Sequence, residues 1–304
     1  MAVGGSAAAG GGIGCKGRRV NDMIMGGNLG IQTFQEDLRT MTKYARYEHD
    51  GGVSYGIVEG NDVHEISAAP YEEYERTGHS VGLGDVRLLA PVMPGKIIAI
   101  GRNYVSHLAH SASLVGGDID LPKVPEPFFK TPSSVVGPND PIVLPREVTE
   151  EGVLVEEEAE LTLVIGKRCR RATQEDALDY VLGVTCGNDV SARNWQRGDL
   201  SWWRAKSSDT FSPIGPYVVT GLDPDNLLLT GRVNGEVIQQ SGTDDLAHNC
   251  RRIIEFVSSV VTLEPGDVIM TGTPGEPGEI KRGDVVEVEL EGVGTLSNPV
   301  IAEE

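Results

Sequence analysis

Two glutamates separated by one residue, Glu158 and Glu160, stand directly before an apolar run at 161–165. On a β-strand, residues two apart share a face, with Cα atoms roughly 6.5–7 Å apart. Carboxylates placed this way repel each other unless water solvates them or they share a cation. Because the segment 156–160 is an acidic run, which is often a solvated face, the pair alone leaves both interpretations open.

A third carboxylate, Asp189, follows the apolar stretch 181–184, where a charge is costly unless it is paired. Three carboxylates, completed by water and ligand oxygens, suit Mg²⁺ or Mn²⁺, which prefer oxygen donors. The sequence has no HxH or HExxH pattern, which argues against zinc. Arg193 and Gln196 follow on the same segment and could bind a carboxylate. These residues predict a magnesium or manganese site.

Two further segments could supply acid–base groups or positive charge. Lys206 lies in the segment RAKSSDT at 204–210, although a lone lysine is usually a solvated surface residue. The segment GRNYVSH at 101–107 leaves the end of an apolar strand at 96–100. Loops at strand ends commonly display catalytic side chains.

Strands predominate among the elements that must position these residues. Buried strands are predicted at 96–100, 161–165 and 217–220, and VVEVEL from Val285 alternates as a half-exposed strand. Many strands and few helices, without a regular βαβ alternation, predict a β-dominated α+β domain over 93–304.

Two helices are predicted in this domain. The first begins at Thr173, with Asp176 in the capping-box position, and its apolar face consists of Leu178, Val181 and Leu182. The second carries apolar residues at helical spacing over 246–261 and ends before Pro265.

The first ninety residues divide into two parts. Residues 1–40 are rich in glycine and lack sustained periodicity, so we expect a flexible extension. Residues 41–92 contain short alternating segments separated by the turn signals Asp50-Gly51-Gly52 and Glu59-Gly60-Asn61-Asp62. These signals predict hairpins in a small β-rich domain.

Composition restricts the classes of partner. The net charge of -19 disfavours binding to nucleic acid or to an anionic membrane, because phosphate binding needs surplus cations. No stretch of about 18 apolar residues could span a bilayer, and the N-terminus lacks the pattern of a secretory signal. The cysteines Cys15, Cys169, Cys186 and Cys250 form no CxxC pair. We therefore expect a cytoplasmic protein with reduced thiols.

Several segments together resemble, in order, the motifs of the fumarylacetoacetate hydrolase family. They are GRNYVSH, EEAELTLVIGKR, GNDVSARNWQ, RAKSSDTFSPIGP, NGEVIQ, LEPGDVIMTGTP and GDVVEVELEGVGTLSNPV. The resemblance covers about residues 41–304, and the sequence is similar to acylpyruvate hydrolase, oxaloacetate decarboxylase and 2-hydroxyhepta-2,4-diene-1,7-dioate isomerase members. It implies a mixed β-sandwich roll of the family type and a homodimer.

Carried over residue by residue, the resemblance also implies roles for the candidate residues. The Mg²⁺ or Mn²⁺ ligands would be Glu158, Glu160 and Asp189. Lys206 would stabilise a developing enolate, and His107 would be the catalytic histidine. The substrate pocket would be lined by Arg102, Tyr104, Arg193, Gln196 and Thr273.

One position departs from the family pattern. Hydrolytic members carry a glutamate three residues after the histidine, and this pair activates water, whereas the present sequence has His110 there. Without the acid, His107 should be a weaker base. Asp118 or Asp120, from the altered loop at 111–127, could substitute for the missing glutamate.

The resemblance implies a small 2-oxo acid as substrate, bound to the metal through its carboxylate and keto oxygens. We expect cleavage of a C–C bond through a metal-stabilised enolate, either by acylpyruvate-type hydrolysis or by oxaloacetate-type decarboxylation. An isomerase of an unsaturated 2-hydroxy or 2-oxo diacid is the main alternative, and His110 favours it. A catalytically silent, ligand-binding member of the fold is the third interpretation.

Overall fold

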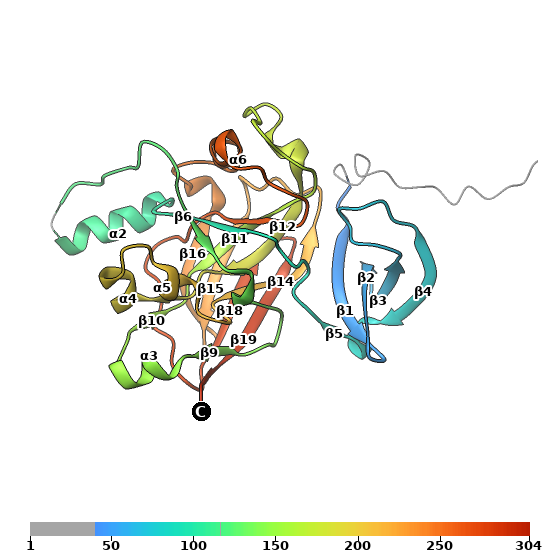
Figure 1. Ribbon diagram of the computed structural model, residues 1–304, viewed down its shortest axis with the longest axis horizontal. Coiled ribbons are helices and arrows are strands. Elements are labelled where there is room, and N and C mark those ends of the chain that lie inside the picture. Colours follow the sequence, from blue (N-terminus) through green and yellow to red (C-terminus); the bar gives the residue numbers. More distant parts are fainter. Residues whose placement is uncertain (1–39, 116) are drawn as a thin grey trace, which may run out of the picture. The chain divides into compact units, whose positions relative to one another are not determined.

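The computed structural model describes residues 40–115 and 117–304, which are dominated by strands arranged in mixed sheets (Figure 1). This confirms the predicted β-dominated α+β class. The predicted flexible extension lies almost wholly at 1–39, outside the described residues.

Five strands form within the part predicted as a small β-rich domain. They are β1 (Lys43–His49), β2 (Gly52–Glu59), β3 (Asp62–Ile66), β4 (Arg76–Gly82) and β5 (Arg87–Leu88). The first two pair antiparallel around Asp50 and Gly51, whose φ angles of 50° and 77° suit a tight hairpin turn. Gly60 and Asn61 join the next pair, so both predicted turns are confirmed.

The remaining strands follow along the chain with short helices between them. The strands are β6 (Ile97–Gly101), β7 (Glu126–Lys130), β8 (Val135–Val136), β9 (Ile142–Leu144), β10 (Val155–Glu156), β11 (Ala159–Ile165), β12 (Val181–Asn188), β13 (Ser191–Ala192), β14 (Ser212–Val219), β15 (Leu228–Val233), β16 (Glu236–Gly242), β17 (Val268–Met270), β18 (Val285–Leu290) and β19 (Gly294–Ala302). The helices are α2 (Val105–Val115), α3 (Arg146–Glu151), α4 (Arg193–Gly198), α5 (Trp203–Ser207) and α6 (Cys250–Val260).

Two sheets enclose the main core. The larger sheet runs in the order β4-β3-β2-β1-β14-β12-β11-β17-β6-β7, and the smaller one in the order β16-β15-β18-β19-β9. Strand β12 contacts β18, and β14 contacts β19, so the sheets face each other. Buried side chains from both sheets, such as Leu163 of β11 and Val288 of β18, belong to one apolar cluster. Burial of this apolar surface stabilises the arrangement that carries the candidate site.

The predicted strands and the second helix are confirmed, but the first helix is wrong. Asp176 does accept hydrogen bonds from the backbone and hydroxyl of Thr173, at 2.6 and 2.9 Å. Only one 3₁₀ turn follows, Ala177–Tyr180, and Val181 then begins β12. That strand, which includes the β-branched residues Val181, Val184 and Thr185, pairs with β11 on one side and β14 on the other, and this pairing prevails over the local helical signal.

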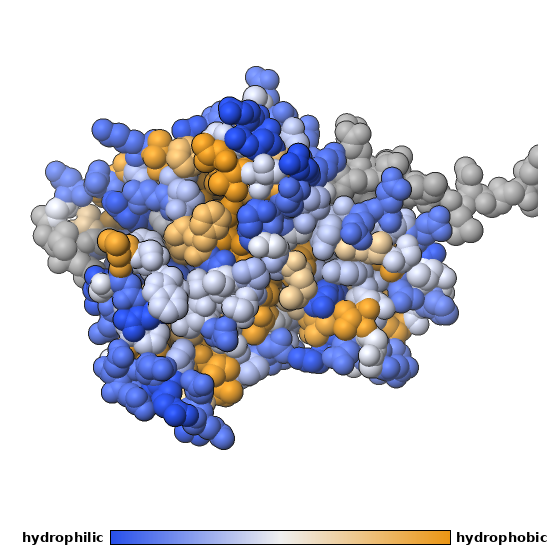
Figure 2. Space-filling model, in the orientation of Figure 1, coloured by the Kyte–Doolittle hydropathy of each residue, from blue (hydrophilic) through white to orange (hydrophobic). Residues whose placement is uncertain are grey.

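Hydrophilic residues cover most of the face shown in Figure 2, as the net charge of -19 leads us to expect. Among the described residues, no helix is long and apolar enough to cross a membrane. Cys169, Cys186 and Cys250 are buried and unpaired, whereas Cys15 lies outside the described residues.

Candidate active site

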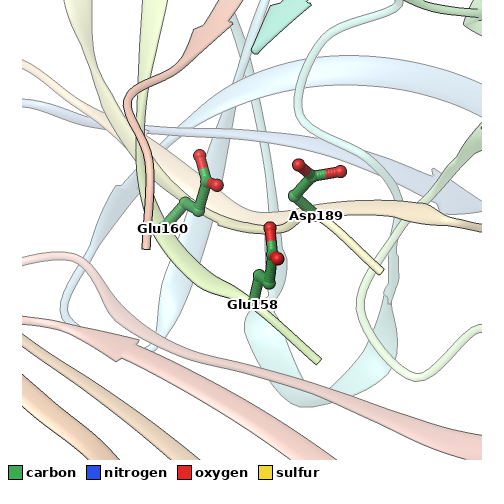
Figure 3. Close-up of side chains that lie close together, drawn as sticks. All are labelled: Glu158, Glu160 and Asp189. Carbon is green, nitrogen blue, oxygen red and sulfur yellow. The ribbon is translucent and has the colours of Figure 1, made fainter. Parts of the chain in front are cut away.

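The antiparallel pairing of β11 with β12 brings the three predicted carboxylates together (Figure 3). Glu158 lies just before β11, Glu160 lies on it, and Asp189 follows the end of β12. The Asp189 amide donates to the Glu158 carbonyl at 3.0 Å, which fixes the two ends of the strands to each other. One oxygen from each carboxylate lies within 4.8 Å of the others. All three residues are buried, so the solvated-face interpretation of the acidic run is wrong.

Gly272, in the segment TGTP, supports this cluster from the opposite side. Its amide donates to Glu160 Oε2 at 2.8 Å. Its φ of 106° lies in the region that favours glycine, and an added Cβ would lie 3.0 Å from the Cβ of Asn103. A larger residue here would therefore disturb the backbone donor that holds Glu160.

Three buried or nearly buried cations face two of the carboxylates. Lys206 of α5 lies 2.7 Å from both Glu158 and Asp189, so it is not a solvated surface lysine. Arg193 of α4 lies 2.6 Å from Glu158. Lys130, at the end of β7, pairs with Asp189 and donates to the carbonyl of Phe211 at 2.9 Å.

Sequence reasoning missed Lys130. The only signal in the sequence was that a single lysine follows the apolar pair Phe128-Phe129. A charge buried at such a place requires a partner of opposite charge. Nothing in the spacing of the sequence linked that lysine to Asp189. The link arises because β7 pairs with β6 at one end of the larger sheet, and α5 contacts β7.

The charges are unevenly distributed over the cluster. Burial would raise the pKa of Glu158, but Lys206 and Arg193 outweigh it and hold that pKa below its ordinary value. Burial, and then the charges of Asp189 and Glu158, hold the pKa of Glu160 well above its ordinary value. Within the described residues, Glu160 has no ion pair at all. A divalent ion would supply the missing positive charge, and three carboxylates are a donor set that Mg²⁺ and Mn²⁺ accept.

This imbalance predicts that ion binding depends on pH. A proton held by Glu160 must leave before that carboxylate can bind an ion, so Mn²⁺ affinity should increase as the pH rises above the ordinary glutamate value of 4.5. Calorimetric titrations in buffers of different ionisation enthalpy should show proton release on binding. An affinity that stays constant over this range would show that Glu160 is already ionised.

A small cavity of about 70 Å³ opens onto the carboxylates. Glu158, Glu160, Asp189, Lys206 and Thr273 are the buried polar residues of its lining, while Arg102, His107, Arg193, Gln196 and Trp202 are more exposed. The lining is completed by Ile100, Gly101 and Phe128. The cavity thus has a closed, charged end and a more open rim.

The cavity lining contains all but one of the predicted site residues. Tyr104 is instead fully buried, packs in the main apolar cluster and is not part of the lining. The residue that sequence reasoning missed at the rim is Trp202. Its ring packs edge-on against the ring of Phe128, and the two ring centroids are 5.4 Å apart. Gln239 was missed as a support: it donates to the Thr273 hydroxyl at 2.9 Å and accepts from the Ala159 amide at 3.0 Å.

His107 lies on α2 and is held by a backbone group. Its Nδ1 is 2.6 Å from the carbonyl oxygen of Gly275, so Nδ1 carries the hydrogen in this contact. In a neutral ring, Nε2 is then the basic nitrogen. Among residues 40–115 and 117–304, no carboxylate forms an ion pair with His107; Asp118 is exposed, and the Asp120 carboxylate lies 3.8 Å from Arg102.

Within the part of the chain that the structure describes, the acid that pairs with His110 comes from a different segment. Glu276 Oε2 lies 3.7 Å from His110 Nδ1. The neighbouring Gly275 amide donates to the Ser106 hydroxyl at 3.2 Å. The first half of α2 is therefore docked on the loop that follows the TGTP segment.

Family models match two parts of the chain. Residues 96–301 match the family model described as fumarylacetoacetate (FAA) hydrolase C-terminal, and residues 42–91 match the one described as Rv2993c-like, N-terminal. The mitochondrial oxaloacetate tautomerase fahd2 of Xenopus laevis is 42% identical over 236 residues, covering 73% of this chain and 71% of that protein.

Two solved structures extend the comparison. The 5-carboxymethyl-2-hydroxymuconate delta-isomerase of Mycobacterium smegmatis is 42% identical with a TM-score of 0.78, and the match covers 86% of this chain and 100% of that one. The maleylpyruvate hydrolase of Sphingobium sp. SYK-6, solved with manganese(II) ion and pyruvate, is 29% identical with a TM-score of 0.70 and the same coverage. The family match spans most of the chain and confirms the resemblance seen in the motifs. The chain belongs to the fumarylacetoacetate hydrolase family.

Proposed function

We propose that this protein is a Mg²⁺- or Mn²⁺-dependent enzyme that moves a proton between carbon and oxygen in a small 2-oxo acid, as a keto–enol tautomerase or isomerase. The observation that supports this choice is the partner of His107, which is the backbone carbonyl of Gly275 instead of a carboxylate. Proton abstraction beside a keto group needs a well-placed base of moderate strength, whereas hydrolysis also needs an activated water molecule.

The roles follow from the cavity. An ion held by Glu158, Glu160 and Asp189 would polarise the keto and carboxylate oxygens of the substrate. His107 Nε2 takes the proton from the carbon next to the keto group, the electron pair of that C–H bond forms a C=C bond, and the π pair of the carbonyl moves onto the keto oxygen. The imidazolium of His107 then returns the proton to that oxygen, which gives the enol and restores the neutral ring. The ammonium group of Lys206, fixed beside the cluster, stabilises negative charge on that oxygen. The Gln196 amide lines the cavity and can donate to the substrate carboxylate, whereas the Thr273 hydroxyl donates to the Ala159 carbonyl at 2.9 Å.

The named relatives support proton transfer first and C–C cleavage second. The Xenopus laevis relative is named a tautomerase, and the Mycobacterium smegmatis structure is named an isomerase. The Sphingobium structure is named a hydrolase and keeps hydrolysis as the second candidate. This order reverses the sequence-based expectation, in which hydrolysis or decarboxylation preceded isomerisation.

A panel of assays tests the proposal. Metal-loaded protein should accelerate the ultraviolet change of enol oxaloacetate as it converts to the keto form, and EDTA should remove that acceleration. The same preparation should release pyruvate from an acylpyruvate, or CO₂ from oxaloacetate, far more slowly. Fast pyruvate or CO₂ release without accelerated tautomerisation would replace our proposal with C–C cleavage, and ligand binding without any turnover would reject both.

The homodimer and the cytoplasmic location are also proposals, and the family resemblance supports the first. Light scattering coupled to size-exclusion chromatography measures the mass of the particle directly, and a mass of one chain would contradict the dimer.

A further inference from the structure

His107 depends on a backbone group outside its own helix. Its Nδ1 lies 2.6 Å from the carbonyl oxygen of Gly275, and this contact keeps a hydrogen on Nδ1. A neutral imidazole carries a single ring N–H. Without a fixed acceptor at Nδ1, that hydrogen could move to Nε2, which would then no longer be basic. The position of the Gly275 carbonyl therefore determines which ring nitrogen is the base.

A buried glutamine fixes the chain just before this carbonyl. Gln239 of β16 is 2% exposed, and its side-chain amide donates to the Pro274 carbonyl and, at 2.9 Å, to the Thr273 hydroxyl. Its oxygen accepts from the Ala159 amide at 3.0 Å. Both ends of the side-chain amide thus have partners, and they tie residues 273–274 to the first residue of β11, directly after Glu158.

The same loop is tied at its other end by Glu157. The Glu157 backbone amide donates to the Gly278 carbonyl at 2.9 Å, and Oε1 of its side chain accepts from the Gly278 amide at 3.2 Å. Gly275 thus lies between two anchored positions, and both anchors lead to the residues that flank Glu158. The carbonyl that orients the histidine ring is therefore fixed relative to the carboxylate cluster.

The strand of this glutamine also leads to the helix of His107. After β16 comes a 3₁₀ turn, Thr243–Asp245, and Asp245 Oδ2 accepts from the Ser106 amide at 3.0 Å. That amide belongs to the first turn of α2, where backbone donors lack partners within the helix and the helix dipole favours a carboxylate. Thr243 is buried and exchanges two hydrogen bonds of 2.9 Å with Leu227. One fixed segment therefore holds both the helix of the ring and the loop of its acceptor.

We propose that Gln239 and Asp245 are positioning residues for His107. Gln239 keeps the Gly275 carbonyl against Nδ1, and Asp245 keeps α2 in place, so Nε2 remains the basic nitrogen. Both residues lie outside the cavity lining, so they act through His107 and not on the substrate. The role of Nε2 as the base rests on the proposed function, whereas the position of the ring hydrogen is a property of the protein without substrate.

The first test locates the ring hydrogen by NMR of metal-free protein with isotope-labelled histidine. Spectra are recorded at about pH 8, where an ordinary imidazole is neutral, and the His107 signals are identified by their loss in His107→Gln. We expect the hydrogen on Nδ1 in the wild type and a population shifted toward Nε2–H in Gln239→Met, which keeps the length but removes the hydrogen bonds. Gln240→Met, at the exposed neighbouring position of β16, is the matched control and should resemble the wild type.

The second test measures oxaloacetate tautomerisation with Mg²⁺ present. In Gln239→Met, kcat should fall about 10- to 100-fold, because a misplacement of about 1 Å can lower a rate about 10²-fold. KM should stay within about threefold, since the variant retains the groups that bind substrate. Melting curves check that each variant is folded, and the shorter Gln239→Asn replaces Gln239→Met if that variant does not fold.

The variants of Asp245 test the other end of the segment. Asp245→Ala should also lower kcat, and Asp245→Asn should restore most of the loss because an amide oxygen can still accept from the Ser106 amide. Asp244→Ala removes the exposed neighbouring carboxylate and should leave kcat unchanged.

The outcomes separate this inference from the proposed function. An unchanged ring tautomer or an unchanged kcat in a folded Gln239 variant would overturn the role of Gln239, and so would an equal loss in Gln240→Met. Asp245→Asn as damaging as Asp245→Ala would overturn the role of Asp245. If the metal-loaded wild type does not accelerate tautomerisation, the proposed function itself fails, while the NMR measurement still tests Gln239.

Discussion

Glu160→Gln should separate ion binding from folding. Removing this ionic ligand should weaken Mn²⁺ binding by about 100-fold or more, since even outer partners of metal ligands alter affinity 10–100-fold. Turnover should fall in parallel. Without metal, however, the variant should melt a few degrees above the wild type, because a buried carboxylate without an ion pair has been replaced by a neutral amide that can still accept from the Gly272 amide.

The sign of the pH effect follows from the raised pKa of Glu160. A carboxyl whose pKa is higher in the folded chain stabilises that chain least when the pH is high. The metal-free wild type should therefore lose stability relative to Glu160→Gln as the pH rises above the ordinary glutamate value of 4.5. Melting curves in EDTA, recorded at several pH values, measure this difference. A variant less stable than the wild type at every pH would contradict the account.

Asp189→Ala provides the contrast. It removes the partner of both Lys130 and Lys206, so it leaves two buried ammonium groups with fewer counter-charges. Removing one member of a buried ion pair typically lowers the free energy of unfolding by about 3–5 kcal/mol. We expect Asp189→Ala to lose both ion binding and stability, whereas Glu160→Gln should lose ion binding alone.

His110→Glu should convert a poor hydrolase into a better one. Residues three apart on a helix are neighbours, so the new carboxylate lies beside His107 on α2. Acylpyruvate cleavage should increase by about one to two orders of magnitude, within the range of about 10²–10⁴ typical of general-base contributions. Tautomerisation of oxaloacetate should change less, because it needs no attacking water.

The position of Glu276 affects the design of this experiment. Its carboxylate lies 3.7 Å from the His110 ring, so a glutamate at position 110 would face a like charge. The double variant His110→Glu/Glu276→Gln should therefore show the larger gain. If the wild type already hydrolyses well and Glu276→Gln, Asp118→Asn or Asp120→Asn alone reduces that rate, a substitute acid exists and our interpretation of His110 is wrong.

The sequence was informative where local pattern and tertiary pairing agree. The alternation of VVEVEL and the turn at Asp50-Gly51 predicted elements that the structure contains. The helix predicted from Thr173 is wrong although its capping contacts are present. The residues after Tyr180 are more stable when they pair in a sheet than when they continue a helix. Local signals cannot report which long-range pairing is available.

The candidate site shows the same limit. Glu158, Glu160 and Asp189 could be proposed together because two sit next to a buried strand and the third follows another, and the family motifs named them. Lys130 carried no such signal, and its contact with Asp189 exists only once β7 and α5 are in place. Tyr104 was placed at the pocket by motif alone, yet its side chain is fully buried. Side-chain direction at the start of a helix is set by packing, which a motif does not encode.

The most direct test of the account is the rate of oxaloacetate tautomerisation as a function of Mn²⁺ bound per chain. Metal-free protein is titrated with Mn²⁺, bound ion is counted by electron paramagnetic resonance, and the rate is measured in the same samples. We predict a rate at background without the ion, a linear increase, and a plateau at one bound ion per chain. The same titration of Glu160→Gln should show neither tight binding nor an increase in rate. A full rate in metal-free wild type, or a rate that does not follow bound Mn²⁺, would contradict a catalytic ion held by Glu158, Glu160 and Asp189.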